Sequence, residues 1–247
     1  MQTLKGQVLH EELRRHMPLR EEHSLGVCLV VDADRTLCSE DTGRLIGQGF
    51  GVNRSIRRIF EQLGYQDEAF TAVSALWSAI HKEAYLYELE SVANGIQLRA
   101  CWMYILNILT DRVPILVLTA GIPQVWRRIL SNAGHARIPV LGGCHLELDE
   151  YAISARSKGD IVNALRELGW RVIAAGDSCV DLPMLVAAHV ALFVPDHKGS
   201  PALRSELAVV PSIRHLLVDD QRFDGLSTCT VMEAAKMILQ GGVWSAN

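Results

Sequence analysis

The chain has 247 residues, of which 49% are apolar and 21% charged, with a formal net charge of −4 and a pI near 6.1. This is the composition of a globular protein with one sizeable core and a smaller subdomain. The slight acidic excess argues against a nucleic-acid partner, because such proteins normally have a basic surplus. Small anionic ligands are not excluded, since only the local field in a cleft decides their binding.

The chain shows no sign of export or membrane insertion. Its six cysteines are scattered without the spacing of metal ligands, which is typical of reduced thiols in the cytoplasm. The N-terminal segment is polar and lacks the apolar stretch of a signal peptide. The longest apolar runs, near 25–33, 113–120 and 184–194, are too short to span a bilayer. We therefore expect a cytoplasmic protein without a membrane partner.

Short apolar runs alternate with helical patterns along the chain, and a further helix is expected within the first 20 residues. Apolar residues at helical spacing predict a helix over 158–168, which Gly169 ends. Continuous apolar runs are typical of strands that helices cover on both faces. The predicted strands occupy 25–31, 113–118, 171–175 and 190–194. The pattern favours an α/β fold with a doubly wound, Rossmann-like parallel sheet.

A helical block interrupts this alternation after the first strand. Residues 56–63 form an amphipathic helix that Gly64 ends, and residues 68–90 predict one longer helix. An insertion at this point lies over the strand ends and can act as a lid. The predicted domains are a core of residues 1–40 and 110–247 and a helical cap of residues 41–109.

Polar side chains follow three of the predicted strands at the points where the strands end. The carboxyl ends of parallel strands meet at one edge of a sheet, where ligands bind. A lysine at the start of the helix before the third strand is expected at the same edge. The residues expected in one cleft are Asp32, Asp34, Thr119, Lys158, Asp177 and Asp181.

Four carboxylates in one cleft need a counter-charge, because their repulsion would raise their pKa values or open the site. A hard divalent cation with oxygen ligands resolves this and points to Mg2+. With the cation in place, the cleft attracts a phosphate. The suitable donors to its oxygens are the Thr119 hydroxyl, the backbone amides at Ala120 and Gly121, and the Lys158 ammonium.

These residues together resemble the four motifs of the haloacid dehalogenase superfamily of phosphohydrolases, in the same order and spacing. A single such motif is weak evidence, whereas four in order, each at a strand end or helix start, are strong. The most similar branch is that of the phosphoserine phosphatases, which has a helical cap after motif one. The matching motifs are Asp32-x-Asp34-x-Thr36, Thr119, Lys158 and Gly176-Asp177-x-x-x-Asp181.

The resemblance implies a role for each residue. Asp32 would be the nucleophile, and Asp34 would be the general acid and then the general base. The phosphate-binding residues would be Thr119, Ala120, Gly121 and Lys158. The ligands of Mg2+ would be Asp32, the backbone carbonyl of Asp34, and Asp177, with Asp181 either as a further ligand or as an acid just outside the ligand shell. The implied activity is magnesium-dependent hydrolysis of a small metabolite phosphate through an aspartyl-phosphate intermediate.

The chain departs from this branch at positions beside the phosphate and at the position that binds the substrate's amino group. Motif two has Thr119 where the branch usually has serine, and motif four has Val180 where asparagine is usual. Asp41, with Glu40 beside it, aligns with the glutamate that binds the substrate's amino group. We therefore expect these two acids to contact a cationic substrate group, although none of the cap arginines matches the family's carboxylate-binding arginine by motif.

Other functions stay open at this point. A phosphotransferase or mutase would use the same Asp32 intermediate. A non-catalytic regulatory or binding protein with this fold is disfavoured, because a decayed site normally loses its nucleophile first. A protein phosphatase is disfavoured by the cap. Exposed apolar residues of the cap also leave a homodimer open.

Overall fold

The computed structural model describes residues 2–3, 6–18, 25–149, 151–194, 206–207, 213–216 and 228–241. The predicted core range of 110–247 therefore lies partly outside the described residues.

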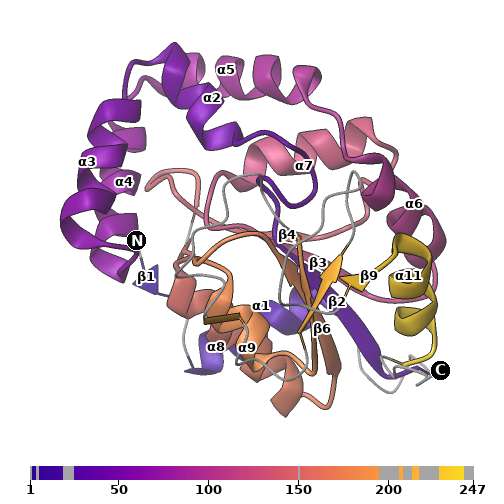
Figure 1. The fold of residues 1–247 in the computed structure, drawn as a ribbon. Helices are drawn as coiled ribbons and strands as arrows, with labels where there is room; N and C mark the ends of the chain where they lie inside the picture. Colours follow the sequence, from indigo (N-terminus) through magenta and orange to yellow (C-terminus); the bar gives the residue numbers. More distant parts are fainter. Residues whose placement is uncertain are drawn as a thin grey trace.

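In the described part of the chain, seven parallel strands form the central sheet, in the order β4-β3-β2-β6-β7-β8-β9. Figure 1 shows this sheet among the surrounding helices. The chain enters at β2, adds β3 and β4 on one side, and then adds β6 and its successors on the other. Such a reversal beside the first strand is where open α/β sheets bind ligands. The strands are β2 (Val27–Val31), β3 (Ile115–Leu118), β4 (Val140–Leu141), β6 (Arg171–Gly176), β7 (Val190–Phe193), β8 (Ile213–Leu216) and β9 (Thr228–Cys229).

Helices cover both faces of the sheet, so the predicted doubly wound fold is confirmed. Val27, Leu29 and Val31 of β2 belong to one core, whereas Cys28 and Val30 belong to the other. This alternation follows from the period of two in a strand. The first core includes α6 (Ala100–Leu109), α7 (Pro123–Asn132) and α11 (Val231–Leu239). The second includes α1 (Gly6–His16), α8 (Ala155–Glu167) and α9 (Leu182–Ala187).

The N-terminal segment joins the second core. Leu13 of α1 is fully buried, and α1 packs against α8. Before it, β1 (Gln2–Thr3) pairs in parallel with β5 (Tyr151–Ala152). The helix expected within the first 20 residues is therefore present and contributes to the core. In the described parts of the chain, none of the helices is long and apolar enough to cross a membrane.

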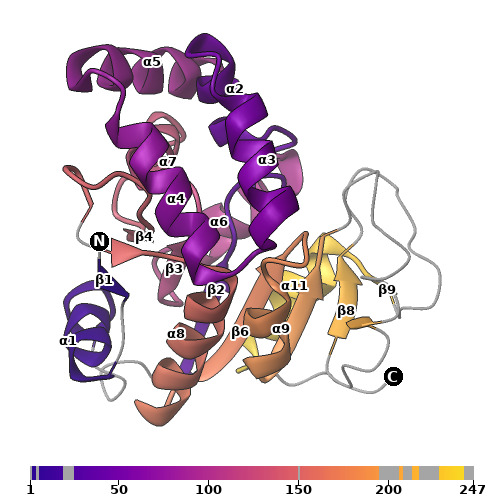
Figure 2. The same ribbon diagram turned by 90° about the vertical axis from the view of Figure 1, so that its left-hand side faces the viewer.

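Four helices that follow β2 lie over the carboxyl end of the sheet (Figures 1 and 2). The predicted helix over 56–63 is present and ends at Gly64, whose φ of 64° suits glycine. The single helix predicted over 68–90 is wrong, because the chain breaks after Ser78 and resumes at Lys82. The helices are α2 (Thr42–Gly49), α3 (Asn53–Leu63), α4 (Asp67–Ser78) and α5 (Lys82–Gly95).

Helix α6 packs with α11 on the face of the sheet. Its Trp102, Ile105 and Leu106 are fully buried in the same core as β2. We propose on this basis that the cap consists of α2–α5, and that α6, within the predicted range 41–109, is the crossover helix that leads back to β3.

Hydrogen bonds join the cap to the core. The Ser154 hydroxyl donates to the Asp67 carboxylate of α4 at 2.5 Å. Ser154 is also the N-cap of α8, where its side chain accepts from the Ser157 amide. At the end of α4, the Ser78 hydroxyl accepts from the amide of Leu146 in a core loop, at 2.8 Å. The cap is thus tied to the helix that contains Lys158.

Candidate active site

Asp32 follows the central strand and is held in one orientation. It is 6% exposed, and its amide donates to the carbonyl of Ala175 in the neighbouring strand. Its Oδ1 accepts from Lys158 Nζ at 2.5 Å, and its Oδ2 accepts from Thr36 Oγ1 at 3.0 Å. One carboxylate is therefore fixed by an ammonium and a hydroxyl at the carboxyl end of the sheet.

Lys158 is the fourth residue of α8 and only 1% exposed. Its Nζ also donates to Asp181 Oδ1 at 2.6 Å. Burial lowers the pKa of this ammonium, but the carboxylates of Asp181 and Asp32 raise it more, so that the pKa lies above its ordinary value. The side chain therefore stays charged at neutral pH, between two carboxylates.

Asp181 organises the loop that follows β6. Its Oδ2 accepts from the amide of Asp177 and from both the amide and the hydroxyl of Ser178, at 2.9 to 3.1 Å. At Gly176, a Cβ atom would lie 2.5 Å from the Asp181 Cβ, so glycine is needed for this approach. Both oxygens of Asp181 thus accept hydrogen bonds, one from Lys158 and one from the loop.

Three carboxylates form a compact cluster. Asp32, Asp177 and Asp181 each offer an oxygen, and these oxygens lie within 4.8 Å of one another. Burial and the charge of Asp181 raise the pKa of Asp32 to about 7. Burial and the charges of Asp181 and Asp32 raise the pKa of Asp177 well above its ordinary value. This negative excess, presented by hard oxygen ligands, fits a divalent cation such as Mg2+.

Asp34 lies beside this cluster and contacts the first residue of α2, where the cap begins. Its Oδ1 accepts from the Thr42 amide at 2.6 Å, and its Oδ2 accepts from Trp126 Nε1 at 3.3 Å. Burial and the charge of Asp41 raise its pKa to about 6, although both hydrogen bonds oppose the rise. A carboxyl group that titrates near neutral pH can both donate and accept a proton.

The loop after β3 lies next to Asp34. Thr119 is buried, and its hydroxyl accepts from the amide of Gly121 at 2.9 Å. The N-cap of α7 is Ile122, so the Thr119 hydroxyl serves this loop and not the helix. A Cβ atom at Gly121 would lie 3.1 Å from Asp34 Oδ2. Ala120 and Gly121 together line the cavity between cap and core.

The two acids predicted to select the substrate differ in position. Asp41 lines the cavity, where its Oδ1 accepts from the Arg44 amide and its Oδ2 lies 3.6 Å from Arg35 Nη2. Glu40 is half-buried and does not line the cavity, and its carbonyl accepts from the Arg35 amide. The carboxylate of Asp41 is therefore already engaged by the protein.

The structure adds residues that the sequence analysis did not assign. Arg35 has a φ of 63°, and its Nε lies 3.7 Å from Asp177 Oδ2, which links motif one to motif four. Arg99 donates from Nε to the Cys38 carbonyl and from Nη2 to the Arg35 carbonyl, both at 3.1 Å. Arg99 is far from the motifs in the chain, and Trp126, although it follows Thr119 by seven residues, belongs to none of them, so the motif spacing identified neither residue.

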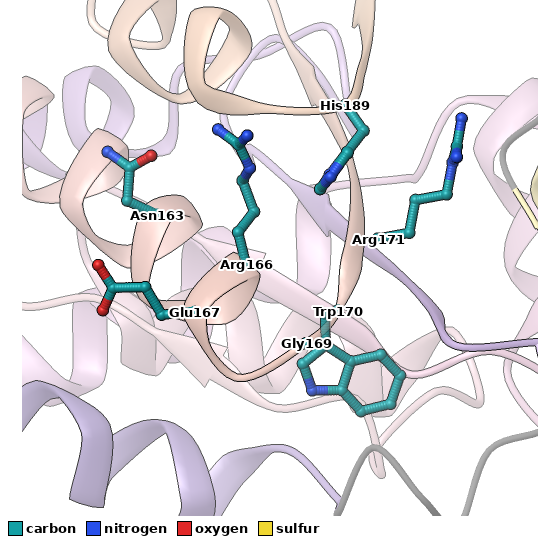
Figure 3. A pocket seen from close by; sticks show the side chains of 7 residues that line it. All are labelled: Asn163, Arg166, Glu167, Gly169, Trp170, Arg171 and His189. Atoms are coloured by element: carbon teal, nitrogen blue, oxygen red, sulfur yellow. The ribbon is translucent and has the colours of Figure 1, made fainter.

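Two large cavities of the described structure lie in different places. One, of about 830 Å³, lies between the cap and the loop after β3. The other, of about 590 Å³, lies at the end of α8 opposite to Lys158 (Figure 3). There, Arg166 donates to the Ala187 carbonyl, and His189 accepts from a backbone amide of β6, so both side chains have structural partners. The first cavity reaches the acidic cluster through Arg35, whose Nε lies 3.7 Å from Asp177 Oδ2, whereas the lining of the second cavity contains none of the site residues.

The chain matches known proteins in its structure but not in its sequence. Models of known protein families and curated protein sequences gave no match. A cytosolic 5′-nucleotidase IIIB bound to cytidine has a TM-score of 0.60 at 17% identity, with 94% of this chain and 90% of that chain covered. A phosphoserine phosphatase from T. onnurineus has a TM-score of 0.53 at 14% identity, with 86% and 94% covered.

A third match is a HAD family hydrolase from Salmonella enterica serovar Typhi. Its TM-score is 0.56 at 19% identity, and the match covers 73% of this chain but only 65% of that hydrolase. Identities this low establish the fold and not the activity. The fold of the chain is therefore similar to the folds of a HAD family hydrolase, a phosphoserine phosphatase and a 5′-nucleotidase, and this likeness agrees with the resemblance found in its motifs.

Proposed function

We propose that the protein is a magnesium-dependent hydrolase of small phosphate monoesters, with Asp32 as the nucleophile. The observation that supports this most is the placement of the Asp32 carboxylate. Lys158 Nζ at 2.5 Å and Thr36 Oγ1 at 3.0 Å hold it at the end of the central strand. Asp34, whose pKa of about 6 suits proton transfer, follows two residues later.

In this mechanism, Asp32 attacks phosphorus in line, and a bond forms between its carboxylate oxygen and phosphorus while the ester bond breaks. Asp34 donates its proton to the leaving alcohol oxygen. Asp34 then accepts a proton from the water that hydrolyses the aspartyl-phosphate. The Thr119 hydroxyl, the loop amides at Ala120 and Gly121, and the Lys158 ammonium would bind the phosphoryl oxygens.

The acidic cluster would hold the metal. The proposed ligands are the carboxylates of Asp32 and Asp177 and the backbone carbonyl of Asp34. Bound there, Mg2+ would neutralise the acids and the negative charge of the phosphoryl group. Asp181 Oδ2 accepts three hydrogen bonds from the motif-four loop and its Oδ1 accepts from Lys158, whereas each oxygen of Asp32 accepts a single hydrogen bond. We therefore propose that Asp181 positions Lys158 and the motif-four loop and contributes to the metal site from outside the ligand shell.

The test is phosphate release from a panel of amino-acid, sugar and nucleoside phosphates, with magnesium and with excess chelator. Magnesium-dependent release from one compact group of compounds is the expected result. A folded protein that releases no phosphate from any compound would overturn the proposal. Repeating the assay with added alcohols as acceptors shows whether the phosphoryl group passes to water or to a second alcohol.

The cap limits the substrate to a small molecule, since a lid over the cleft excludes macromolecules. Phosphorylated metabolites are the proposed class, in keeping with the phosphoserine phosphatases and the cytidine-bound nucleotidase of similar fold. A cytoplasmic location is also proposed, because the six cysteines are scattered along the chain in the manner of reduced thiols.

Asp177→Asn is expected to raise the magnesium concentration for half-maximal activity by roughly tenfold or more. Removing a group that only orients a metal ligand already lowers the affinity for the metal by about 10–100-fold. Removing a ligand itself should lower this affinity by at least as much. The measurement is a magnesium titration of phosphate release. Asp160→Asn, which removes the same charge from the exposed side of α8, serves as the control. An unchanged requirement in the Asp177 variant would show that the metal is bound elsewhere.

Trp126→Phe is expected to move the alkaline limb of the kcat/KM profile to higher pH by roughly half a unit. The Trp126 indole stabilises the ionised form of Asp34 by a hydrogen bond, and its loss raises the pKa of Asp34 further above about 6. Because Asp34 must be protonated for the first step, a higher pKa extends activity to higher pH. The profile is measured at saturating magnesium, and an unshifted alkaline limb would contradict the role of Asp34.

A further inference from the structure

The cavity between cap and core begins at the proposed phosphate site. Ala120 and Gly121 of the loop after β3 form part of its wall, and Gly121 lies against Asp34. This inference rests on the proposed function. If the phosphoryl group is bound beside Asp34, the alcohol part of the ester must extend from Asp34 into this cavity. Its volume of about 830 Å³ is in the range of pockets that hold drug-sized ligands. A leaving group larger than a few atoms therefore has room.

The charges that line this cavity are unbalanced. Four arginines, Arg35, Arg44, Arg54 and Arg57, face one acid, Asp41. Arg35 lies near the carboxylates of Asp41 and Asp177, and Arg57 pairs with Glu61 at 2.8 Å. Within the described part of the chain, Arg44 and Arg54 have no ion-pair partner. Two guanidinium groups from α2 and α3 are thus available to a ligand.

The cavity also has an apolar wall. Phe60, Phe70, Val73 and Trp77 line it from α3 and α4. The rings of Phe60 and Phe70 meet edge to face at a centroid distance of 5.3 Å, and Trp77 is only 3% exposed, so this wall is packed in place. A rigid apolar wall favours a ligand with an aromatic or hydrocarbon portion.

We propose that the preferred substrate is a phosphate monoester whose alcohol part has a second anionic group, a carboxylate or another phosphate, next to an aromatic or hydrocarbon portion. Arg44 and Arg54 bind the second anion, and the wall of Phe60, Phe70 and Trp77 contacts the apolar portion. A cationic group is disfavoured, because the Asp41 carboxylate that was expected to bind it already accepts from the Arg44 amide and lies near Arg35.

The experiment measures binding of three phosphonates that cannot be hydrolysed, by calorimetry with magnesium present. They are benzylphosphonates with a 4-carboxylate, a 4-phosphonomethyl or a 4-aminomethyl group. At least one of the two anionic ligands should bind at least about tenfold more tightly than the cationic ligand. One charge-assisted hydrogen bond to an arginine is enough to give a difference in affinity of about this size. Which of the two anionic ligands binds more tightly shows whether the second anionic group of the substrate is a carboxylate or a phosphate.

The double variant Arg44→Gln, Arg54→Gln should reduce this ratio to near one. Arg58→Gln removes the same charge from α3 outside the cavity lining and should leave the ratio unchanged. Equal or tighter binding of the cationic ligand, or a ratio that survives the double variant, overturns the inference. Turnover of 4-carboxybenzyl phosphate and of the metabolite panel is measured separately: a charge preference in binding without hydrolysis of any of these esters would overturn the proposed function and leave Arg44 and Arg54 assigned as the site of the second anion.

Discussion

Asp32→Asn is expected to reduce turnover on the order of 10⁴-fold or more, to the limit of detection, because it removes the attacking oxygen and keeps the shape of the side chain. The amide oxygen can still accept from Lys158 Nζ, so the site should keep its geometry. Phosphate release is the measurement. Asp111→Asn, at an exposed position before β3, is the control for the change of charge and should retain full activity.

The same variant should be folded at least as stably as the parent at pH 8 without metal. In the folded protein the pKa of Asp32 is raised to about 7, above its ordinary value of 3.8. The cost of ionising it within the fold therefore grows as the pH rises between these two values and persists above the higher one. Asparagine removes that cost. Retained hydrolysis in a variant with an unchanged melting temperature would exclude Asp32 as the nucleophile.

Lys158→Met is expected to lower both activity and stability. It removes the cation between Asp32 and Asp181 and leaves two buried carboxylates that face each other. Breaking a buried ion pair by removing one partner costs about 3–5 kcal/mol, and losing one preorganised charge at a reacting phosphoryl group costs roughly 10²–10³-fold in turnover. Urea unfolding at neutral pH and phosphate release are the two measurements.

The matched control is Arg156→Met on the same helix. Its ion pair with Asp160 is 3.9 Å long and exposed, so the stability should change by less than about 1 kcal/mol. Adding Asp32→Asn to Lys158→Met should recover part of the lost stability, since one of the two uncompensated charges disappears. A Lys158 variant as stable as the Arg156 variant would mean that the buried ion pairs do not hold the site together.

Much of the fold could be predicted because the buried strands are continuous apolar runs. The run before Asp32 ends where the structure ends β2, and the run before Gly176 ends one residue before the end of β6. The break between α4 and α5 could not be predicted, because it follows Ser78, whose hydroxyl bonds to the amide of Leu146. Two-residue strands such as β4 are too short to leave a pattern.

That Asp32, Asp177, Asp181 and Lys158 lie together could be predicted, because these residues stand in short motifs at strand ends or at a helix start. Trp126 and Arg99 could not be predicted, since each contacts motif one or its neighbourhood from a segment that is distant from motif one in the chain. The predicted roles of Glu40 and Asp41 relied on alignment alone. Only the folded chain shows that Asp41 caps α2 and lies near Arg35. Motif position identifies chemistry, whereas specificity depends on how the cap closes over the core.

The hydrogen bond between Asp67 and Ser154 has a consequence for protein engineering. It connects α4 to the N-cap of α8, and Lys158 lies four residues further along α8. A chimera that receives its lid from another enzyme would lose this connection and disturb the position of the lysine. Grafts that retain Asp67 should therefore keep the parental rate of the chemical step, and grafts that lack it should slow that step even where the new lid accepts the new substrate.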